Sequence, residues 1–436
     1  MSKSKLFVLA AAVFVFGVIA VGTGCGGKDK AQTKVKPDVV IWHWMTDRQA
    51  AFDKLAAQYF NETGVRVSFE TYAPTDVYKN KISAAATANL LPDIFNPMGD
   101  RKEVASYINA GYIADLSGEM NRDGWKDVFF EKALMTNTFE AGNEWNVQPG
   151  IYAAPLDVNS LMIYYNKDLF KQAGLDPENP PKTWPEFIEA GKKLRAAGIQ
   201  PFVSGFGEGW LIGAFAQSYQ WNLFGRDGVL QTIEGKIPYT DSRWIKIFSL
   251  FAEMRDNKLF ASGIVTMVNK DAERTFATGK AAMAFNGSWG VNVYNSMAPE
   301  LNYGVMPPPS LPEAKYPLLM FGGEGSSLFV NAKSPNKDKA VEFLRWMTQS
   351  GPQAFLAKET LNIPSNKTVA EDLPPALRIF SESIKNTFEN LPKIEVWQVN
   401  NFININLQSV IIGERTPEQA AKEVQGEKER QMKEAK

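Results

Sequence analysis

Tryptophan rings recur beside carboxylates, amides and glycines in this 436-residue chain. A sugar presents apolar C–H faces together with hydroxyls that each need a donor or an acceptor, so such mixed stretches suit a carbohydrate. A phosphate ligand would instead call for clustered arginines or a P-loop, and the GxxxxGK[ST] pattern is absent. The chemistry indicated is therefore non-covalent recognition of hydroxyl groups. The stretches are "WMTDR" (44–48), "NPMGDR" (96–101), "PLDVN" (155–159), "GFGEGW" (205–210), "NGSW" (286–289) and "FGGEG" (321–325).

Composition excludes several other kinds of site. One histidine and one cysteine are too few for a histidine-rich zinc site, a CxxC redox pair or a disulfide framework. A Ser-His-Asp triad would have to use His43, which lies in the apolar run "IWHWM" and which we expect to be a core or rim residue of a strand. Lys plus Arg number 47 against 48 Asp plus Glu, so a nucleic-acid partner is not expected. We expect no metal, no cofactor and no catalysis.

Strands and helices alternate along the chain and must position these stretches. "VVIWHW" (39–44), "VRVSFE" (65–70) and "LPDIF" (91–95) are predicted strands, and a helical apolar spacing separates the first two. This is the strand-helix-strand unit of a parallel sheet, so the predicted fold class is α/β. Ligands bind beyond the carboxyl ends of strands in open α/β sheets, and we therefore expect the aromatic stretches to be loops there.

Helix starts are marked by capping patterns. The Thr-x-x-Glu/Gln spacing of a capping box occurs at Thr46, Thr183 and Thr416, and Ser334-Pro335 resembles a further helix start.

The first 25 residues read as a targeting segment. Lys3 and Lys5 precede an apolar stretch (6–21), and Cys25 follows "VGTG" in an arrangement that resembles a bacterial lipobox, with Gly22 where leucine is usual. We expect residues 1–25 to be a lipoprotein signal peptide, Cys25 to carry the lipid, and the polar segment 26–37 to be a flexible tether. The protein would then be lipid-anchored on the extracytoplasmic face of a cell membrane, without crossing it.

The run "GIYAAPLDVNSLMIYYNKDLFKQAGLDPENPPKTWPEFIEAGKKL" (150–194) resembles the extracellular solute-binding proteins of bacterial sugar importers, the family of maltose-binding protein. "FATGKAAMAFNGSW" (276–289), "YGVMPPP" (303–309) and "NAKSPNKDKAVEFLRWMT" (331–348) agree in the same order. The resemblance implies a two-lobed protein with a doubly wound sheet in each lobe and a hinge between them. It implies a monomer that captures a mono- or oligosaccharide and delivers it to the permease of an ABC importer.

The family's chain crosses between lobes several times. We expect residues 38–157 and 304–350 to form one lobe, and residues 158–303 and 351–436 to form the other.

The resemblance also implies ligand contacts. Asp100 and Arg101 match an Asp-Arg pair that binds sugar hydroxyls, and Asn159 stands where family members often have an acid, so that Asp157 could take over. The tryptophan of "NGxW" is a stacking floor in the family. The further residues that the match assigns to the ligand site are Glu208, Trp210, Trp289 and, as a second platform, Trp397.

Position after the first strand makes Trp44, Asp47 and Arg48 weaker candidates, and Glu324 joins them if its glycine-rich stretch faces the cleft. Trp184 and Tyr165 are expected to serve packing.

Two alternatives stay open. The same fold could bind a charged solute such as a uronate, glycerol phosphate or a polyamine, with Arg48, Arg101 and Arg226 as cations for an acidic ligand. A carbohydrate-active enzyme would need two carboxylates, for example Asp100 and Glu208, about 5 to 9 Å apart.

Overall fold

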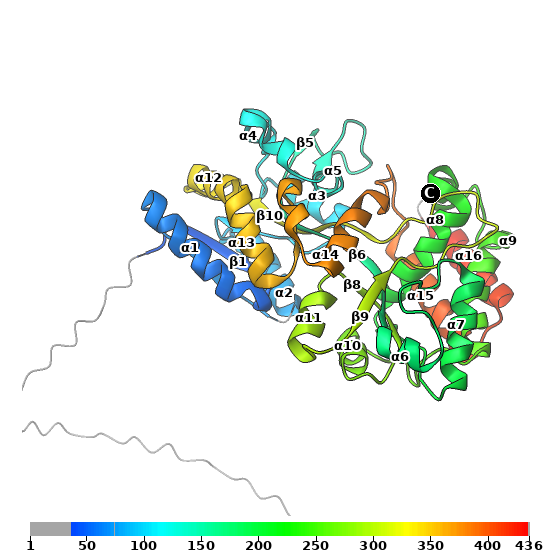
Figure 1. The fold of residues 1–436 in the computed structure, drawn as a ribbon. Coiled ribbons are helices and arrows are strands. Elements are labelled where there is room, and N and C mark those ends of the chain that lie inside the picture. Colours follow the sequence, from blue (N-terminus) through cyan, green and yellow to red (C-terminus); the bar gives the residue numbers. More distant parts are fainter. Residues whose placement is uncertain (1–35, 74, 435–436) are drawn as a thin grey trace, which may run out of the picture. The chain divides into compact units, whose positions relative to one another are not determined.

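The computed structural model describes residues 36–73 and 75–434, and the compact unit begins at Pro37 (Figure 1). The predicted signal peptide, Cys25 and nearly all of the predicted tether lie outside the described residues. Among those residues, no helix has the length and apolar character needed to cross a membrane.

A single large sheet runs through the unit in the order β2-β1-β3-β10-β6-β8-β7, with β9 and β11 also paired to β6. Strands β1, β2 and β3 are parallel, whereas β10 is antiparallel to both β3 and β6. The predicted α/β class is confirmed. The strands are β1 (Val39–His43), β2 (Val67–Thr71), β3 (Ile94–Phe95), β6 (Ala154–Asn166), β7 (Phe202–Val203), β8 (Met283–Gly287), β9 (Tyr303–Met306), β10 (Gly322–Val330) and β11 (Ile363–Pro364), and β4 (Thr138–Phe139) pairs with β5 (Gly150–Ile151) in a separate hairpin.

Helices cover both faces of each half of the sheet. At the β1 end, Ile41 packs with Phe52 of α1, while Phe95 of β3 faces the opposite side and packs with Tyr78 of α2. The helices and 3-10 helices (η) from this end and the connection to β6 are η1 (Thr46–Arg48), α1 (Gln49–Thr63), α2 (Thr75–Ala88), α3 (Arg101–Asn109), α4 (Ser117–Asn121), η2 (Arg122–Val128), α5 (Glu131–Thr136), α12 (Lys337–Met347) and α13 (Ser350–Thr360).

The β8 end is built in the same way. Ile163 of β6 faces the α7, α8 and α9 side, and its neighbour Tyr164 faces α10 and α14, so the strand alternates between two cores. The expected doubly wound arrangement in two lobes is therefore observed. The remaining elements are α6 (Lys167–Gln172), α7 (Trp184–Ala196), α8 (Gly209–Ile233), α9 (Ser242–Asp256), α10 (Asn269–Ala277), α11 (Gly290–Met297), η3 (Lys367–Asp372), α14 (Pro375–Ser383), η4 (Ile384–Asn386), α15 (Trp397–Ile412) and α16 (Pro417–Glu434).

Two stretches predicted as loops lie in strands instead. "PLDVN" belongs to β6, and "FGGEG" belongs to β10 from its second residue, Gly322, with Glu324 paired to Val158. The loop prediction was wrong because both strands cross from one half of the sheet to the other, which puts polar residues in mid-strand. β6 thus runs without interruption through the predicted crossing at residues 157–158.

Helix α13 packs on α1 beside the β1 half, with Leu356 in the same core as Leu55. Ala357 of the same helix belongs to the core of the β8 half, so α13 contacts both halves, and the assignment of residues 351–436 to the other lobe stays a prediction.

The capping boxes at Thr183 and Thr416 are confirmed by reciprocal bonds with Glu186 and Gln419. The one at Thr46 is wrong, since α1 begins at Gln49, whose side-chain oxygen contacts the His43 ring of β1 and accepts from the Thr71 hydroxyl of β2 instead. Helix α12 begins at Lys337, and Ser334 caps the turn before it, since its hydroxyl accepts from the Asn336 backbone N–H at 2.9 Å and donates to Asp93.

Candidate functional site

A cavity of about 310 Å³, here called the central cavity, lies where β1, β6 and β8 meet the loops that follow them. It collects residues that are far apart in the sequence. They are Trp44, Met45, Thr46 and Arg48 from the β1–η1 segment, Asp157, Val158 and Asn159 from β6, Ser288, Trp289, Asn292 and Val293 beyond β8, together with Lys270, Ser326 and Asn362.

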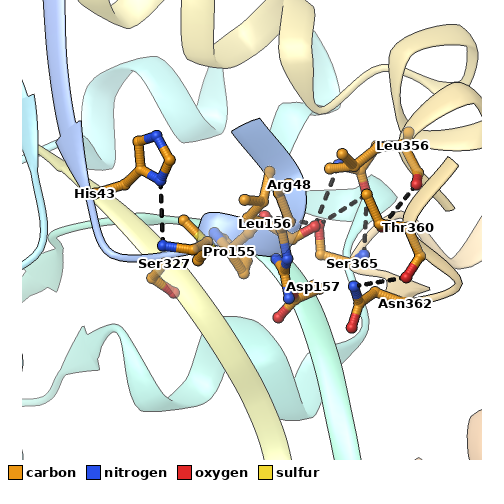
Figure 2. Close-up of polar contacts among 12 residues, drawn as sticks. His43, Arg48, Pro155, Leu156, Asp157, Ser327, Leu356, Thr360, Asn362 and Ser365 are labelled. Carbon is orange, nitrogen blue, oxygen red and sulfur yellow. Dashed lines mark hydrogen bonds and ion pairs between the residues drawn. The ribbon is translucent and has the colours of Figure 1, made fainter. Parts of the chain in front are cut away.

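Arg48 and Asp157 form a buried ion pair in the wall of the central cavity (Figure 2). The pair joins η1 to β6, and the side chains are 10% and 6% exposed. Removing one partner of such a pair leaves an uncompensated charge in a medium that solvates it poorly. Arg48 and Asp157 thus depend on each other.

The backbone beside Asp157 is held in place by buried polar side chains. Ser365 donates to the carbonyl of Pro155 at 2.6 Å, and Gln353 donates to that of Leu156 at 3.2 Å (Figure 2). On the other side, β10 has a bulge at Gly325, where an added Cβ would lie 2.2 Å from Asp157 Oδ1. Glycine is required there because the carboxylate occupies that space.

Asn159 lies two residues after Asp157 and therefore on the same face of β6. Its side-chain oxygen is buried, and among the described residues it has no hydrogen-bond partner. A buried unpaired acceptor costs free energy unless a ligand supplies a donor. A hydroxyl would do so.

Glu324 lies on β10 opposite Val158. Burial raises the pKa of its carboxyl group to about 7, a hydrogen bond with Ser327 opposes that rise, and the nearby Asp157 charge adds to it. The β6 side of the site thus holds two interacting acids and one arginine.

Trp289 and Trp210 form the aromatic side of the site. Their ring centroids are 6.0 Å apart, with Trp289 lining the central cavity and Trp210 lining an adjoining cavity of about 530 Å³. Glu208 accepts from the Trp210 indole at 2.8 Å and from the Asn269 backbone N–H at 2.7 Å.

Asp100 and Arg101 line the adjoining cavity rather than the central one. Asp100 caps α3 by accepting from the Glu103 backbone N–H at 2.9 Å. Arg101 donates to the carbonyls of residues 135, 136 and 138 and stacks on Phe139. Its guanidinium is therefore largely engaged in holding the α5–β4 turn.

The remaining candidates lie apart or are only partly described. Trp44 lines the central cavity and packs on Tyr78. Asp47 belongs to η1, and its side chain is outside the described part of the structure. Trp397 begins α15 with its side chain 71% exposed, and it lines none of the cavities described above.

Five residues of the central cavity lie outside the stretches that the sequence singled out. Asn292 and Val293 follow Trp289, and Ser326 directly follows "FGGEG", so extending those two stretches would have found them. Lys270 and Asn362 come from α10 and from the turn after α13, where the local sequence gives no signal. Within the described residues, no group of His, Cys, Asp or Glu side chains is arranged to hold a metal ion.

Residues 42–354 match the family model described as bacterial extracellular solute-binding protein. An sn-glycerol-3-phosphate-binding periplasmic protein of Brucella melitensis is 25% identical over 422 residues, which cover 91% of this chain and 92% of that protein. A multiple sugar-binding protein of Streptococcus mutans is 25% identical over 266 residues, or 59% of each chain.

Solved structures show the same fold. A chitin oligosaccharide binding protein superposes with a TM-score of 0.74 at 23% identity, covering 90% of this chain and 98% of that one. Maltose-bound MalE3 of T. maritima gives a TM-score of 0.71 at 21% identity, covering 89% and 98%.

Proposed function

The chain belongs to the bacterial extracellular solute-binding proteins, and from that premise we propose that it captures a neutral carbohydrate in the central cavity. The observation that carries this proposal is the composition of the cavity wall. The Trp289 indole, which can stack on a sugar face, and the Asn159 side-chain oxygen, which has no donor among the described residues, line the same cavity.

Charge in the central cavity favours a neutral ligand over an anionic one. Of the described residues that line it, Arg48 and Lys270 are cationic, and each is paired with an acid, Asp157 and Glu273 respectively. A phosphate or uronate would therefore meet cations whose charge is already balanced. The similarity to a glycerol phosphate-binding protein is the reason for testing an anionic ligand as well.

Binding would favour the closed state of the two lobes, because the ligand contacts residues from both halves of the sheet. An enzymatic role has weaker support. The candidate acid-base pair is already engaged, since both oxygens of Glu208 accept hydrogen bonds and Asp100 caps a helix.

We also propose that Cys25 is lipidated and tethers a monomer to the extracytoplasmic face of the membrane, where an ABC importer receives the ligand. A Cys25→Ser variant should be released from the membrane fraction and should not incorporate a fatty acid. Size-exclusion chromatography of the released protein tests the monomer.

The ligand is tested by thermal unfolding against neutral mono- and oligosaccharides, uronates, polyamines and glycerol phosphate. A ligand at 100 times its dissociation constant adds about 2.7 kcal/mol of stability, which raises the melting temperature by several degrees. We expect stabilisation by one neutral sugar series. Stabilisation by glycerol phosphate or a uronate alone would refute the neutral-sugar proposal.

A further inference from the structure

Trp210 and Trp289 reach the site from different elements, yet their rings meet. Trp210 is the second residue of α8, Trp289 precedes α11, and the two ring planes lie at 50°. Among the ring contacts of the described residues, this is the only one between two tryptophans. Because Trp289 lines the central cavity and Trp210 the adjoining one, the ring contact connects the linings of the two cavities.

A carboxylate holds each indole N–H. Glu208 accepts from Trp210 Nε1 at 2.8 Å, and Glu273 accepts from Trp289 Nε1 at 3.3 Å. Glu273 is 1% exposed, and its hydrogen-bond donors also include Lys270 Nζ at 3.0 Å. Hydrogen bonds to an ionised acceptor are stronger than neutral ones and fix the donor's direction.

Asn269 connects the two carboxylates. Its backbone N–H donates to Glu208 at 2.7 Å, and its side-chain amide donates to Glu273 at 3.0 Å. Asn269 is also the first residue of α10, where an acid such as Glu208 is favourably placed. One residue thus couples both acids and, through them, both indoles.

Two glycines permit this close arrangement. A Cβ on Gly205 would lie 2.6 Å from Asn269 Cα, and a Cβ on Gly287 would lie 2.1 Å from Cζ3 of Trp289. The loop before α8 can therefore approach α10, and the Trp289 ring can lie against the end of β8.

We propose that Glu208, Asn269 and Glu273 form an indole clamp that holds Trp210 and Trp289 as one preorganised platform. These three are positioning residues, and Glu208 acts on the ligand through Trp210 rather than by direct contact. The inference rests on the proposed function for the claim that a sugar uses the platform. Fixing the rings before binding lowers the entropy lost when the ligand arrives.

The first test needs no ligand. Two indoles at this separation give an exciton couplet in circular dichroism, isolated as the difference between the intact protein and its Trp210→Phe variant. Glu273→Met removes every acceptor while keeping similar bulk and should diminish the couplet. Glu273→Gln retains one side-chain oxygen. This oxygen can still accept from Trp289 and from the side-chain amides of Asn269 and Asn286, so the couplet should be preserved.

A carboxylate–indole bond that involves neither Trp210 nor Trp289 provides a matched control. Glu62 accepts from the Trp346 indole at 2.7 Å, so Glu62→Met removes the same kind of bond and should leave the couplet unchanged. If Glu273→Met fails to fold, Asn269→Leu breaks the link while keeping the backbone bond to Glu208, and it should also diminish the couplet.

Affinity for the sugar found by thermal unfolding gives the second readout. Glu273→Met should weaken sugar binding about tenfold, which is the size of effect seen when a residue that orients a metal ligand is lost, and Glu273→Gln should restore the affinity. An unchanged couplet in both Glu273→Met and Asn269→Leu would overturn the clamp, whatever the ligand. A lost couplet with no change in sugar affinity would support the clamp and overturn the placement of the ligand on it.

Discussion

The β8 side and the β6 side of the central cavity bury polar groups in different ways. On the β8 side, Glu208 and Glu273 accept from indoles, amides and one exposed lysine. On the β6 side, Arg48 and Asp157 face each other as buried charges, with Glu324 beside them. The β8 side therefore presents indole rings whose N–H groups are held by carboxylates, whereas on the β6 side the buried charges of an arginine and an aspartate balance each other. We therefore expect ligand affinity to be most sensitive on the first side and stability on the second.

The largest effect should come from unbalancing the ion pair. Arg48→Met removes the cation that faces the buried Asp157 carboxylate and should lower the free energy of unfolding by about 3 to 5 kcal/mol. Urea denaturation measures this. The double variant Arg48→Met/Asp157→Leu should recover most of the loss, because it leaves no uncompensated charge. Equal stability of Arg48→Met and the unmodified protein would show that the ion pair does not stabilise the β6 side, and the expected difference between the two sides would be wrong.

The next effect concerns ligand affinity on the β8 side. Trp289→Ala should weaken binding of the identified sugar by at least about 30-fold, or about 2 kcal/mol, as loss of a central aromatic contact does at interfaces. Calorimetric titration gives the value. Trp397→Ala is the matched comparison, because that residue is 71% exposed and lines neither cavity. The sugar affinity of this variant should stay within about twofold of that of the unmodified protein. A reversed order would move the platform to α15.

The smallest effect is a pH dependence on the β6 side. The pKa of Glu324 is about 7 in the folded protein, against its ordinary 4.5, so the folded state binds more protons between these values. Stability should therefore fall as pH rises through that window, by at most about 1.4 kcal/mol for each pH unit. Comparing the melting temperature at several pH values with that of Glu324→Gln isolates the effect. A variant with the same pH slope as the unmodified protein would show that Glu324 does not titrate there.

Much of the fold could be predicted from local patterns. The apolar run at 39–44 gave β1 within one residue, and two of the three capping boxes are present. Strand β10 could not be found in this way, because its glycine-rich start is typical of a loop. Its strand character comes from pairing with β6 and β3, which no local pattern encodes.

The candidate site was predictable as a set of residue types and less so as a set of contacts. Trp289, Asp157 and Asn159 line one cavity, as a shared site requires. The roles of Glu208 and Arg101 were not predictable, since a carboxylate or guanidinium in a loop can face a ligand or bind neighbouring groups. Here Glu208 contacts Trp210 and Asn269, and Arg101 contacts three carbonyls.

Strand β10 also sets the order in which the chain can fold. It lies between β3 and β6 in the sheet, and the bond from Asn96 to the Ser327 carbonyl spans 231 residues. The first half of the sheet therefore stays incomplete until about three quarters of the polypeptide has been synthesised. Contacts of such long range slow folding. In a family of extracellular proteins, a nascent chain that is slow to fold stays unfolded for longer, which favours passage across a membrane.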